Sequence, residues 1–469
     1  MAKKPLGKDK FGVQKVMRTG DYFGDSLGQF ALNAMSGLVA QLTYFYTDKV
    51  GLAAAAVGTM LFICKIVDAF TDLIMGNIVD HTPPGKERYR PWLIKGGVPG
   101  AIVVALLFMV PDAIGPAKLA YMFITNVLLT AVFVTAVTIP YSSLMVVRTN
   151  SQEERGNMGT WRAAAGYVSG MIIAVGTVPI TNMLGGDQAA WIKYGFVFAL
   201  LVVLCMLLCY RSSRETATEK GAAPAEPVAV AEEEATPFWQ AVGMLFQNKY
   251  WVMVLVANLC AQVSYGLSNS AGTYYCKWIY GDDNLVGIQG AIGMIPTLAG
   301  FILVTPMVKK LGVTKTLRVS FLIGVVANLL RLINPTNFIY NTTLSCFSSF
   351  ANIPMMCLLG VMSAMAVDYN EYKFGKRMIA CSQSAASFGN KVGNGFGASI
   401  VAWLLGLAGY LGAAQVELTP ALRQAIYGFS IYLPLVLFAV MFVIAMRFDL
   451  EAKLPGIHQE IAARKQAQA

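Results

Sequence analysis

Long apolar runs, separated by short polar segments, dominate this chain. A helix that crosses a bilayer needs about 20 mainly apolar residues, and twelve stretches approach that length. The pattern therefore predicts membrane-spanning helices near residues 28–47, 53–80, 93–110, 117–146, 158–183, 190–210, 248–277, 284–308, 315–333, 338–366, 379–408 and 425–447. The expected fold class is an all-α membrane protein with twelve transmembrane helices.

A polar stretch divides these helices into two sets of six. Residues 211–237 are rich in Ala, Glu and Pro, a composition that cannot bury a core. We therefore predict an N-terminal six-helix half over 1–210, a cytoplasmic linker over 211–237, a C-terminal six-helix half over 238–447 and a cytoplasmic tail over 448–469. Two pseudo-symmetric halves of this kind are common among secondary transporters.

The composition supports a membrane protein. The chain is 56% hydrophobic and 13% charged, whereas a soluble domain carries about 25% charged residues. Its net charge of +10 comes from short basic clusters between apolar runs, which disfavours a nucleic-acid partner. The clusters precede the first predicted helix and follow the second, fourth, eighth and tenth. The positive-inside rule then predicts a multi-pass protein of the cell inner (plasma) membrane with both termini cytoplasmic.

Cysteine and histidine give little sign of a reactive centre. The eight cysteines form no CxxC pair, and the two histidines, His81 and His458, lie in polar segments. This pattern indicates neither a zinc site nor a disulfide framework. A membrane-embedded enzyme would need a histidine cluster or an activated serine or cysteine, which the sequence does not present. We therefore expect no enzymatic activity, no catalytic residues and no cofactor.

Three ionisable residues interrupt the second predicted helix, in the run CKIVDAFTDLIMG. Asp68 and Asp72 lie four residues apart and share a helix face, which Lys65 joins. A charge at mid-bilayer costs about 2.5–3.5 kcal/mol, so such residues normally face a bundle interior or a wet cavity. With Thr71 beside them, the carboxylates suit a hard cation or a shared proton. The alternative is a Lys65–Asp68 ion pair that only locks the helix; we favour cation coupling, because one lysine cannot neutralise two aspartates.

Two further bases stand among apolar residues. Arg162 lies near the start of its helix, so the alternative to a binding role is that it reaches out to the interface. Lys391 lies near the middle of its helix, in the run CSQSAASFGNKVGNGFGAS. The glycines of that run predict close helix packing, and its serines and asparagines would line a cavity.

The segment after the tenth predicted helix, DYNEYKFGKR, mixes acids and bases. Asp368, Glu371 and Arg377 are either ordinary charges of a cytoplasmic loop or part of a salt-bridge gate that closes against Arg155. The residue types leave both interpretations open.

Several of these motifs together resemble one family. They are YFYTDKVGL (44–52), DAFTDLIMGNIVD (68–80), RYRPW (88–92), TIPYSSL (138–144) and DYNEYK (368–373), with the lysine of the eleventh helix. Nearly the whole chain is similar to the glycoside–pentoside–hexuronide:cation symporters of the major facilitator superfamily, which include melibiose permease and the glucuronide permeases.

The resemblance implies roles at matching positions. Asp68, Thr71, Asp72 and Thr135 would bind the coupling cation, Na⁺ or H⁺, and no other metal is implied. The implied substrate-binding residues are Asn33, Thr138, Arg162, Ser387, Asn390 and Lys391. Asn33, in a loosely matching region, and Thr138 stand where melibiose permease has acids. Ser142 and Met356 replace its sugar-stacking tryptophans. These departures argue against melibiose as substrate and bring the chain closer to the glucuronide permeases.

The expected function is therefore cation-coupled symport of a sugar or glycoside by alternating access. Lys65, Arg162 and Lys391 against Asp68 and Asp72 leave one positive charge in excess. Because buried uncompensated charge is costly, this favours an acidic glycoside, such as a hexuronide or glucuronide, over a neutral sugar. A lysolipid or other amphiphile carrier of the same fold is the alternative, and it would show a lateral apolar opening. The expected partners are a small-molecule substrate, the coupling cation and the lipid bilayer.

Overall fold

The computed structural model describes residue 7 and residues 14–80, 89–112, 114–149, 151–214, 243–375, 379–415 and 417–468. The chain divides into two compact units. Unit 1 is Met1–Val228 with Leu411–Ala414, and unit 2 is Ala229–Tyr410 with Gln415–Ala469.

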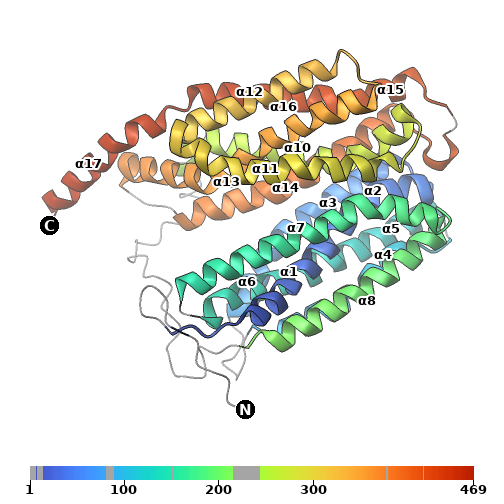
Figure 1. Cartoon of the computed structure of the whole chain (residues 1–469), viewed down its shortest axis with the longest axis horizontal. Coiled ribbons are helices and arrows are strands. Elements are labelled where there is room, and N and C mark those ends of the chain that lie inside the picture. Colours follow the sequence, from blue (N-terminus) through green and yellow to red (C-terminus); the bar gives the residue numbers. More distant parts are fainter. Residues whose placement is uncertain are drawn as a thin grey trace. The chain divides into compact units, whose positions relative to one another are not determined.

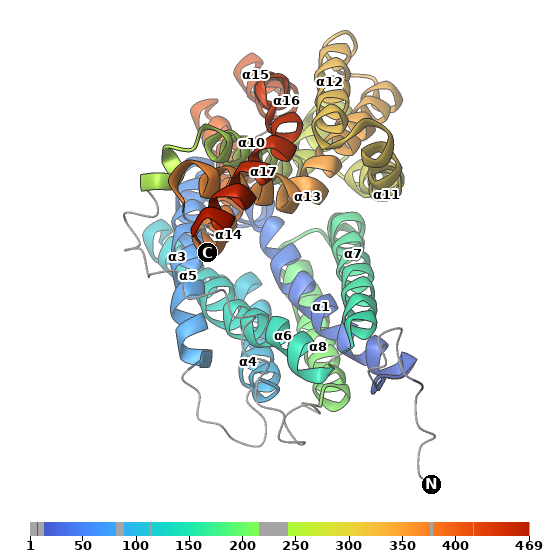
Figure 2. The same ribbon diagram turned by 90° about the vertical axis from the view of Figure 1, so that its left-hand side faces the viewer.

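The long helices of unit 1 run alongside one another (Figures 1 and 2). The π-helix η1 continues α1 and α2, and the π-helix η2 joins α5 to α6, so the long elements form six rods. In chain order the elements are α1 (Thr19–Ala40), α2 (Leu42–Tyr44), η1 (Phe45–Lys49), α3 (Ala54–Asp80), α4 (Pro91–Phe108), α5 (Gly115–Val127), η2 (Leu128–Val134), α6 (Thr135–Arg148), α7 (Gln152–Met183), α8 (Gln188–Ser212) and the short 3₁₀ helix η5 (Gly412–Ala414).

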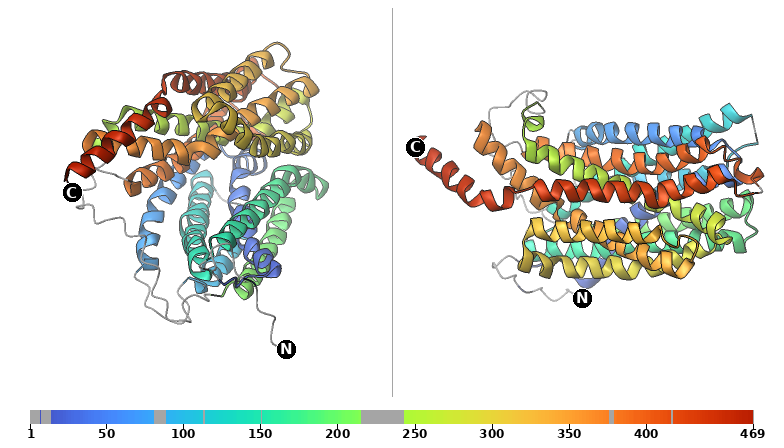
Figure 3. Two further views of the ribbon diagram at one scale, coloured as in Figure 1. Left: turned by 60° about the vertical axis from the view of Figure 1, so that its left-hand side comes forward. Right: turned by 90° about the horizontal axis from the view of Figure 1, so that it is seen from above.

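Unit 2 repeats this plan and adds a terminal helix, α17, which extends past the ends of its other helices (Figure 3). Its elements are α10 (Lys249–Tyr275), η4 (Cys276–Tyr280), α11 (Leu285–Leu311), α12 (Val313–Arg331), α13 (Phe338–Phe374), α14 (Ile379–Leu407), α15 (Pro420–Tyr427), η6 (Gly428–Tyr432), α16 (Leu433–Arg447) and α17 (Leu450–Gln468).

Ten helical spans of the described chain are long and apolar enough to cross a membrane. Two long helices, α1 and α14, are not among them. Both carry polar side chains within their length, including Asp25, Gln29 and Asn33 on α1 and Asn390 and Lys391 on α14. Both helices carry candidate substrate residues, and polar side chains of this kind normally face a bundle interior or a wet cavity in a membrane protein.

Close packing between helices depends on glycine at particular points. A Cβ on Gly266 of α10 would lie 2.2 Å from the carbonyl oxygen of Asn394 on α14, and one on Gly397 of α14 would lie 2.3 Å from that of Val263 on α10. The two backbones thus touch where neither has a side chain, as small residues permit in membrane helices. The glycines of the eleventh predicted helix were expected to pack in this way.

Two predicted boundaries were wrong in ways that matter for function. The first helix begins at Thr19 rather than near residue 28, so Asp25 is helical and buried. The tenth extends to Phe374 rather than 366, so Asp368 and Glu371 lie on α13 and not in a loop. In both cases charged residues interrupt the apolar run without ending the helix.

Candidate functional site

Asp68 on α3 is buried and faces the start of α6. Its Oδ1 lies 3.4 Å from Thr135 Oγ1, and its Oδ2 lies 3.6 Å from Lys65 Nζ. Thr71 is half-buried, and its hydroxyl donates to the Asp68 backbone carbonyl at 3.0 Å. Asp68 and Thr135 therefore come together from two helices, whereas the Thr71 hydroxyl bonds to the backbone of its own helix; the Lys65–Asp68 ion pair is also present. The backbone of α3 passes through Asp72, whose side chain lies outside the described part of the chain.

The π-helix η2 sets which residue of the fourth rod faces Asp68. Thr135 Oγ1 lies 3.2 Å from the carbonyl oxygen of Thr130, five residues earlier. In a continuous α-helix, positions five apart point about 140° away from each other, so Val134 would take that place. The i→i+5 spacing of a π-helix, a feature frequent at functional sites, brings Thr130 and Thr135 onto one face.

A cleft of about 400 Å³ lies within unit 1, between α1, α6 and α7. Its lining residues are Gln29, Asn33, Ser142, Met145, Gly159, Arg162, Ala163 and Gly166. Two of the predicted substrate residues, Asn33 and Arg162, thus share one cavity. Thr138 is exposed one turn before Ser142, whose hydroxyl donates to the Thr138 carbonyl at 2.8 Å.

The amides of the cleft are held in place by hydrogen bonds. Gln29 Nε2 donates to Asn33 Oδ1 at 2.7 Å, and Asn33 Nδ2 donates to the Gly166 carbonyl at 3.0 Å. A Cβ on Gly166 would lie 2.8 Å from Asn33 Nδ2, so glycine allows this approach. The polar wall contributed by α1 is therefore fixed against α7 before any ligand binds, which lowers the entropic cost of binding.

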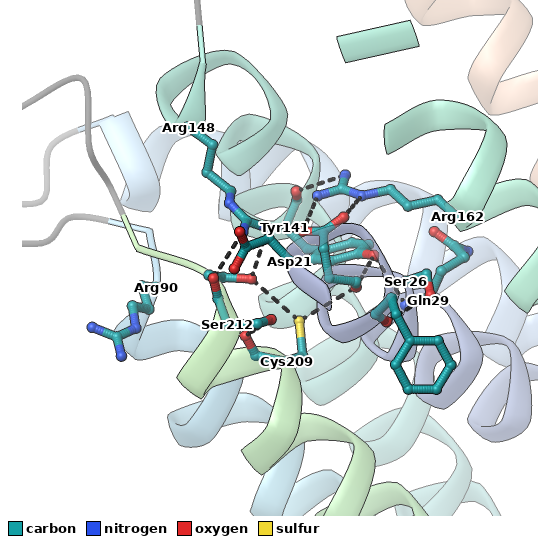
Figure 4. A network of polar contacts seen from close by, with 12 residues as sticks. Asp21, Ser26, Gln29, Arg90, Tyr141, Arg148, Arg162, Cys209 and Ser212 are labelled. Carbon is teal, nitrogen blue, oxygen red and sulfur yellow. Dashed lines mark hydrogen bonds and ion pairs between the residues drawn. The ribbon is translucent and has the colours of Figure 1, made fainter. Parts of the chain in front are cut away.

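In unit 1, three charged residues of three helices meet beside the cleft wall at Arg162; Figure 4 labels two of them, Arg148 and Arg162. Asp25 on α1 is 0% exposed and accepts from Arg162 Nε at 2.6 Å and Arg162 Nη2 at 3.0 Å. Its Oδ1 also accepts from Arg148 Nη1 at 2.8 Å. Asp25, Arg148 and Arg162 are called the Asp25 cluster below. Two guanidiniums against one carboxylate give it one positive charge in excess, because arginine stays protonated in proteins.

Further contacts fix the plane of the Arg162 guanidinium. Its Cζ lies 3.7 Å from the ring centroid of Tyr141, and its Nη1 donates to the Tyr141 carbonyl at 3.0 Å. The Tyr141 hydroxyl donates to the Asp25 carbonyl at 2.7 Å. Arg162 is only 6% exposed, so the alternative in which it reaches out to the interface was wrong. It is a fixed group at the wall of the cleft.

Sequence reasoning missed Asp25 and Arg148. The first predicted helix begins after Asp25, and the sequence predicts no role for Arg148 beyond the basic cluster that follows the fourth helix. The signal available in the sequence was two acids, Asp21 and Asp25, just before an apolar run. What the sequence does not contain is the pairing, because Arg148 and Arg162 lie 123 and 137 residues away along the chain.

The candidate residues of unit 2 are described in part. Asn390 on α14 accepts from Asn258 Nδ2 of α10 at 2.6 Å, and Lys391 is half-buried on the same helix. The side chain of Ser387 lies outside the described part of the chain. Asn390 is therefore held by the helix that packs closest to it, in the same manner as Asn33 in unit 1.

The residues predicted to form a gate are spread over both units. In unit 1, Arg155 Nε donates to the Thr149 carbonyl at 3.0 Å. In unit 2, Asp368 and Glu371 lie on the last turns of α13, and Arg377 falls outside the described residues. The gate stays a prediction.

Comparison with known proteins gives one family model, described as MFS/sugar transport protein, which matches residues 24–452. Among curated relatives, the putative glycoside/cation symporter YagG of Escherichia coli is 27% identical over 98% of this chain and 96% of its own. The glucuronide carrier protein homolog of the same organism is 28% identical over 95% and 96%.

The fold is also found among solved structures. That of the nucleoside transporter NupG superposes with a TM-score of 0.63 over 92% of this chain and 98% of the other, at 12% identity. At this identity the likeness concerns the fold alone. The helices that the structure describes are thus arranged in the major facilitator fold, and the family and the similar proteins named above are transporters rather than enzymes.

Proposed function

Because the chain belongs to the MFS/sugar transport protein family, we propose that it is a secondary symporter that couples the movement of a glycoside to that of a cation. The relative named as a glycoside/cation symporter supports this. Alternating access, in which two six-helix halves rock about a central site, is the expected mode of transport. No covalent step is needed.

The coupling cation is proposed to bind at Asp68, Asp72, Thr71 and Thr135. Carboxylate and hydroxyl oxygens are the ligands that hard cations prefer, and a buried carboxylate pair can alternatively share a proton. The observation in support is the buried Asp68 carboxylate with Thr135 Oγ1 at 3.4 Å. The ion is either Na⁺ or H⁺. In the Na⁺ case Lys65 would have to give up part of its contact with Asp68 when the ion binds.

The substrate is proposed to lie against the cleft in unit 1 and to be acidic. The observation that carries this is Arg162. Three of its five N–H groups have acceptors, one each on Nε, Nη1 and Nη2. The other two, one on each terminal nitrogen, have no acceptor among the residues that the structure describes. A substrate carboxylate could accept both and balance the excess charge of the Asp25 cluster, while Gln29 and Asn33 offer polar groups to sugar hydroxyls.

Including Asp25 and Arg148 does not change the net charge counted over the candidate residues. Asp25 and Arg148 add one negative and one positive charge, so the excess of one positive charge over the candidate residues is unchanged. The relative named as a glucuronide carrier homolog supports an acidic cargo. Thr138 of unit 1 is also proposed to bind the substrate, as are Ser387, Asn390 and Lys391 of unit 2.

Two further parts of the proposal concern topology and gating. The basic clusters favour an inner-membrane protein with both termini in the cytoplasm. Arg155, Asp368, Glu371 and Arg377 are proposed to form a cytoplasmic salt-bridge gate that opens once per transport cycle.

Counterflow into proteoliposomes tests the function. Vesicles preloaded with a glucuronide should exchange it for labelled glucuronide faster when Na⁺ is present, or at lower pH if the ion is H⁺. Glucuronides should compete far better than the matching neutral glucosides. Exchange that does not change with either cation would contradict the proposed coupling. Equal inhibition by glucuronides and neutral glucosides would contradict the proposed acidic substrate.

A further inference from the structure

Tyr141 on α6 does not line the cleft, yet it contacts two of the walls that do (Figure 4). Its ring lies 3.7 Å from Arg162 Cζ, measured to the ring centroid, and its backbone carbonyl accepts from Arg162 Nη1 at 3.0 Å. Its hydroxyl reaches α1, where it donates to the Asp25 carbonyl at 2.7 Å and accepts from the Gln29 N–H at 3.1 Å. One side chain, only 1% exposed, thus touches both Arg162 and the backbone that carries Gln29.

The hydroxyl takes an unusual place on α1. The Asp25 carbonyl and the Gln29 N–H lie four residues apart, and they are the two groups that an α-helix pairs with each other. A hydroxyl that bonds to both groups enters one step of the helical hydrogen-bond ladder. Such an entry is one of the few causes of a local change in helix direction. The course of α1 beyond this step, where Gln29 and Asn33 lie, therefore depends on Tyr141.

Glycine makes this approach possible. A Cβ on Gly28 would lie 2.7 Å from Tyr141 Cε2 and 2.8 Å from Cys209 Sγ. Any larger residue at this position would therefore push the ring away from α1. The contact needs a bare backbone on α1 and, on α6, an aromatic ring with a hydroxyl at its tip.

We propose that Tyr141 is a positioning residue for the substrate, which aligns the Arg162 guanidinium through its ring and the Gln29 side chain through its hydroxyl. This inference rests on the proposed function, because it concerns the glycoside held at the same cleft. The stacked ring keeps the guanidinium plane from turning, so its remaining N–H groups keep one direction toward a substrate carboxylate. The hydroxyl fixes the backbone at Gln29, whose amide donates to Asn33 Oδ1 at 2.7 Å, so both amides are placed together.

The two contacts can be removed separately. Tyr141→Phe removes the hydroxyl and keeps the ring, whereas Tyr141→Leu removes both. The probes are phenyl β-glucuronide and phenyl β-glucoside, which differ only in carrying a carboxylate or a hydroxymethyl group. Inhibition of labelled phenyl glucuronide counterflow by each unlabelled sugar gives the affinity for both and, as their ratio, the preference for the acid.

The two variants should differ in that ratio. Tyr141→Phe should weaken the affinity for both sugars roughly three- to tenfold, the effect of one hydrogen bond, and leave the preference unchanged. Tyr141→Leu should also lower the preference for the glucuronide by roughly tenfold, because the charge-assisted bonds from Arg162 to the carboxylate are no longer well aligned. The control is Tyr194→Phe, since Tyr194 is buried and its hydroxyl lies 2.9 Å from Thr177 Oγ1, away from the cleft lining. It should change neither quantity.

A second readout needs no ligand. The Gln29 amide should exchange its hydrogen roughly three- to tenfold faster in Tyr141→Phe than in the wild type, because the hydroxyl is one of its acceptors. An unchanged exchange rate would refute the positioning role itself. A wild type that binds both sugars alike would instead refute the acidic substrate of the proposed function, so the two failures are distinguishable.

A tyrosine that only holds α1 against α6 gives a different pattern. Both Tyr141 variants would then lower the unfolding temperature in detergent and the amount of active carrier, while the affinities and the preference of the folded protein stayed at wild-type values. That result would overturn the inference. Loss of the preference in Tyr141→Phe would overturn the division of roles between ring and hydroxyl. If Tyr141→Leu does not fold, the affinities and the amide exchange of Tyr141→Phe still decide the role of the hydroxyl.

Discussion

Replacing Thr135 by valine removes a hydroxyl that lies 3.4 Å from Asp68 Oδ1 and 3.2 Å from the Thr130 carbonyl oxygen. The two side chains have nearly the same shape, and Thr135 is 2% exposed, so the packing around the site should be kept. If the cation lies between Asp68 and Thr135, the variant loses a neutral oxygen ligand. Thr135→Ser keeps that oxygen and should behave like the wild type.

The size of the effect follows from the geometry. A hydrogen bond to a charged group contributes about 1.5–3 kcal/mol. The Oγ1 to Oδ1 distance of 3.4 Å is long, which places the contribution at the lower end of that range. About 1.4 kcal/mol corresponds to a tenfold change in a binding constant. We therefore expect Thr135→Val to raise the cation concentration for half-maximal stimulation about tenfold.

Binding of labelled substrate to purified protein, titrated with the cation, measures this directly. Substrate affinity at saturating cation should stay near that of the wild type. Thr130→Val is the matched control, because Thr130 is also buried and its hydroxyl donates to the Asn126 carbonyl of its own helix at 3.0 Å. A shift below twofold in Thr135→Val, or an equal shift in Thr130→Val, would refute the reasoning.

Two other features of the chain give further predictions. Gly397→Ala places a methyl group 2.3 Å from a backbone carbonyl of α10, so it should lower the unfolding temperature in detergent through overpacking of about 1–3 kcal/mol. Gly360→Ala on α13 meets nothing within 4 Å and should not; equal unfolding temperatures would count against the close contact of α10 and α14. Glu371→Ala and Arg377→Ala should each weaken the closed cytoplasmic gate and change transport kinetics, and exchanging a true pair of charges should restore them. Unchanged kinetics in both single variants would leave these residues as ordinary surface charges.

Much of the fold could be predicted from the sequence, because the apolar runs have the length of a bilayer and a polar linker separates them. The inward orientation of Asp68 could also be predicted, since charged residues in an apolar membrane helix need partners inside the protein. That Thr135 lies beside Asp68 could be predicted only from the resemblance to a family. Its physical basis, the five-residue step within η2, is not visible in the hydrophobic pattern.

The Asp25 cluster could not be predicted for two physical reasons. An acid near a helix start lowers the local hydropathy in the same way whether it faces water or an arginine, so the predicted helix began too late. The partners lie on α6 and α7, and only the packing of α1 against them decides that Asp25 meets both. Hydropathy analysis therefore locates a buried ion pair near a helix end less well than it locates the apolar runs themselves.

The central claim is that a cation gradient drives accumulation of substrate through Asp68. The most direct measurement is uptake of labelled glucuronide into proteoliposomes with an imposed Na⁺ or H⁺ gradient, for the wild type, Asp68→Asn and Asp72→Asn. The wild type should concentrate the substrate above the outside level, and both variants should insert normally but only equilibrate it. A variant that still concentrates substrate against its gradient would show that the aspartate is structural, and accumulation by the wild type without either gradient would contradict symport itself.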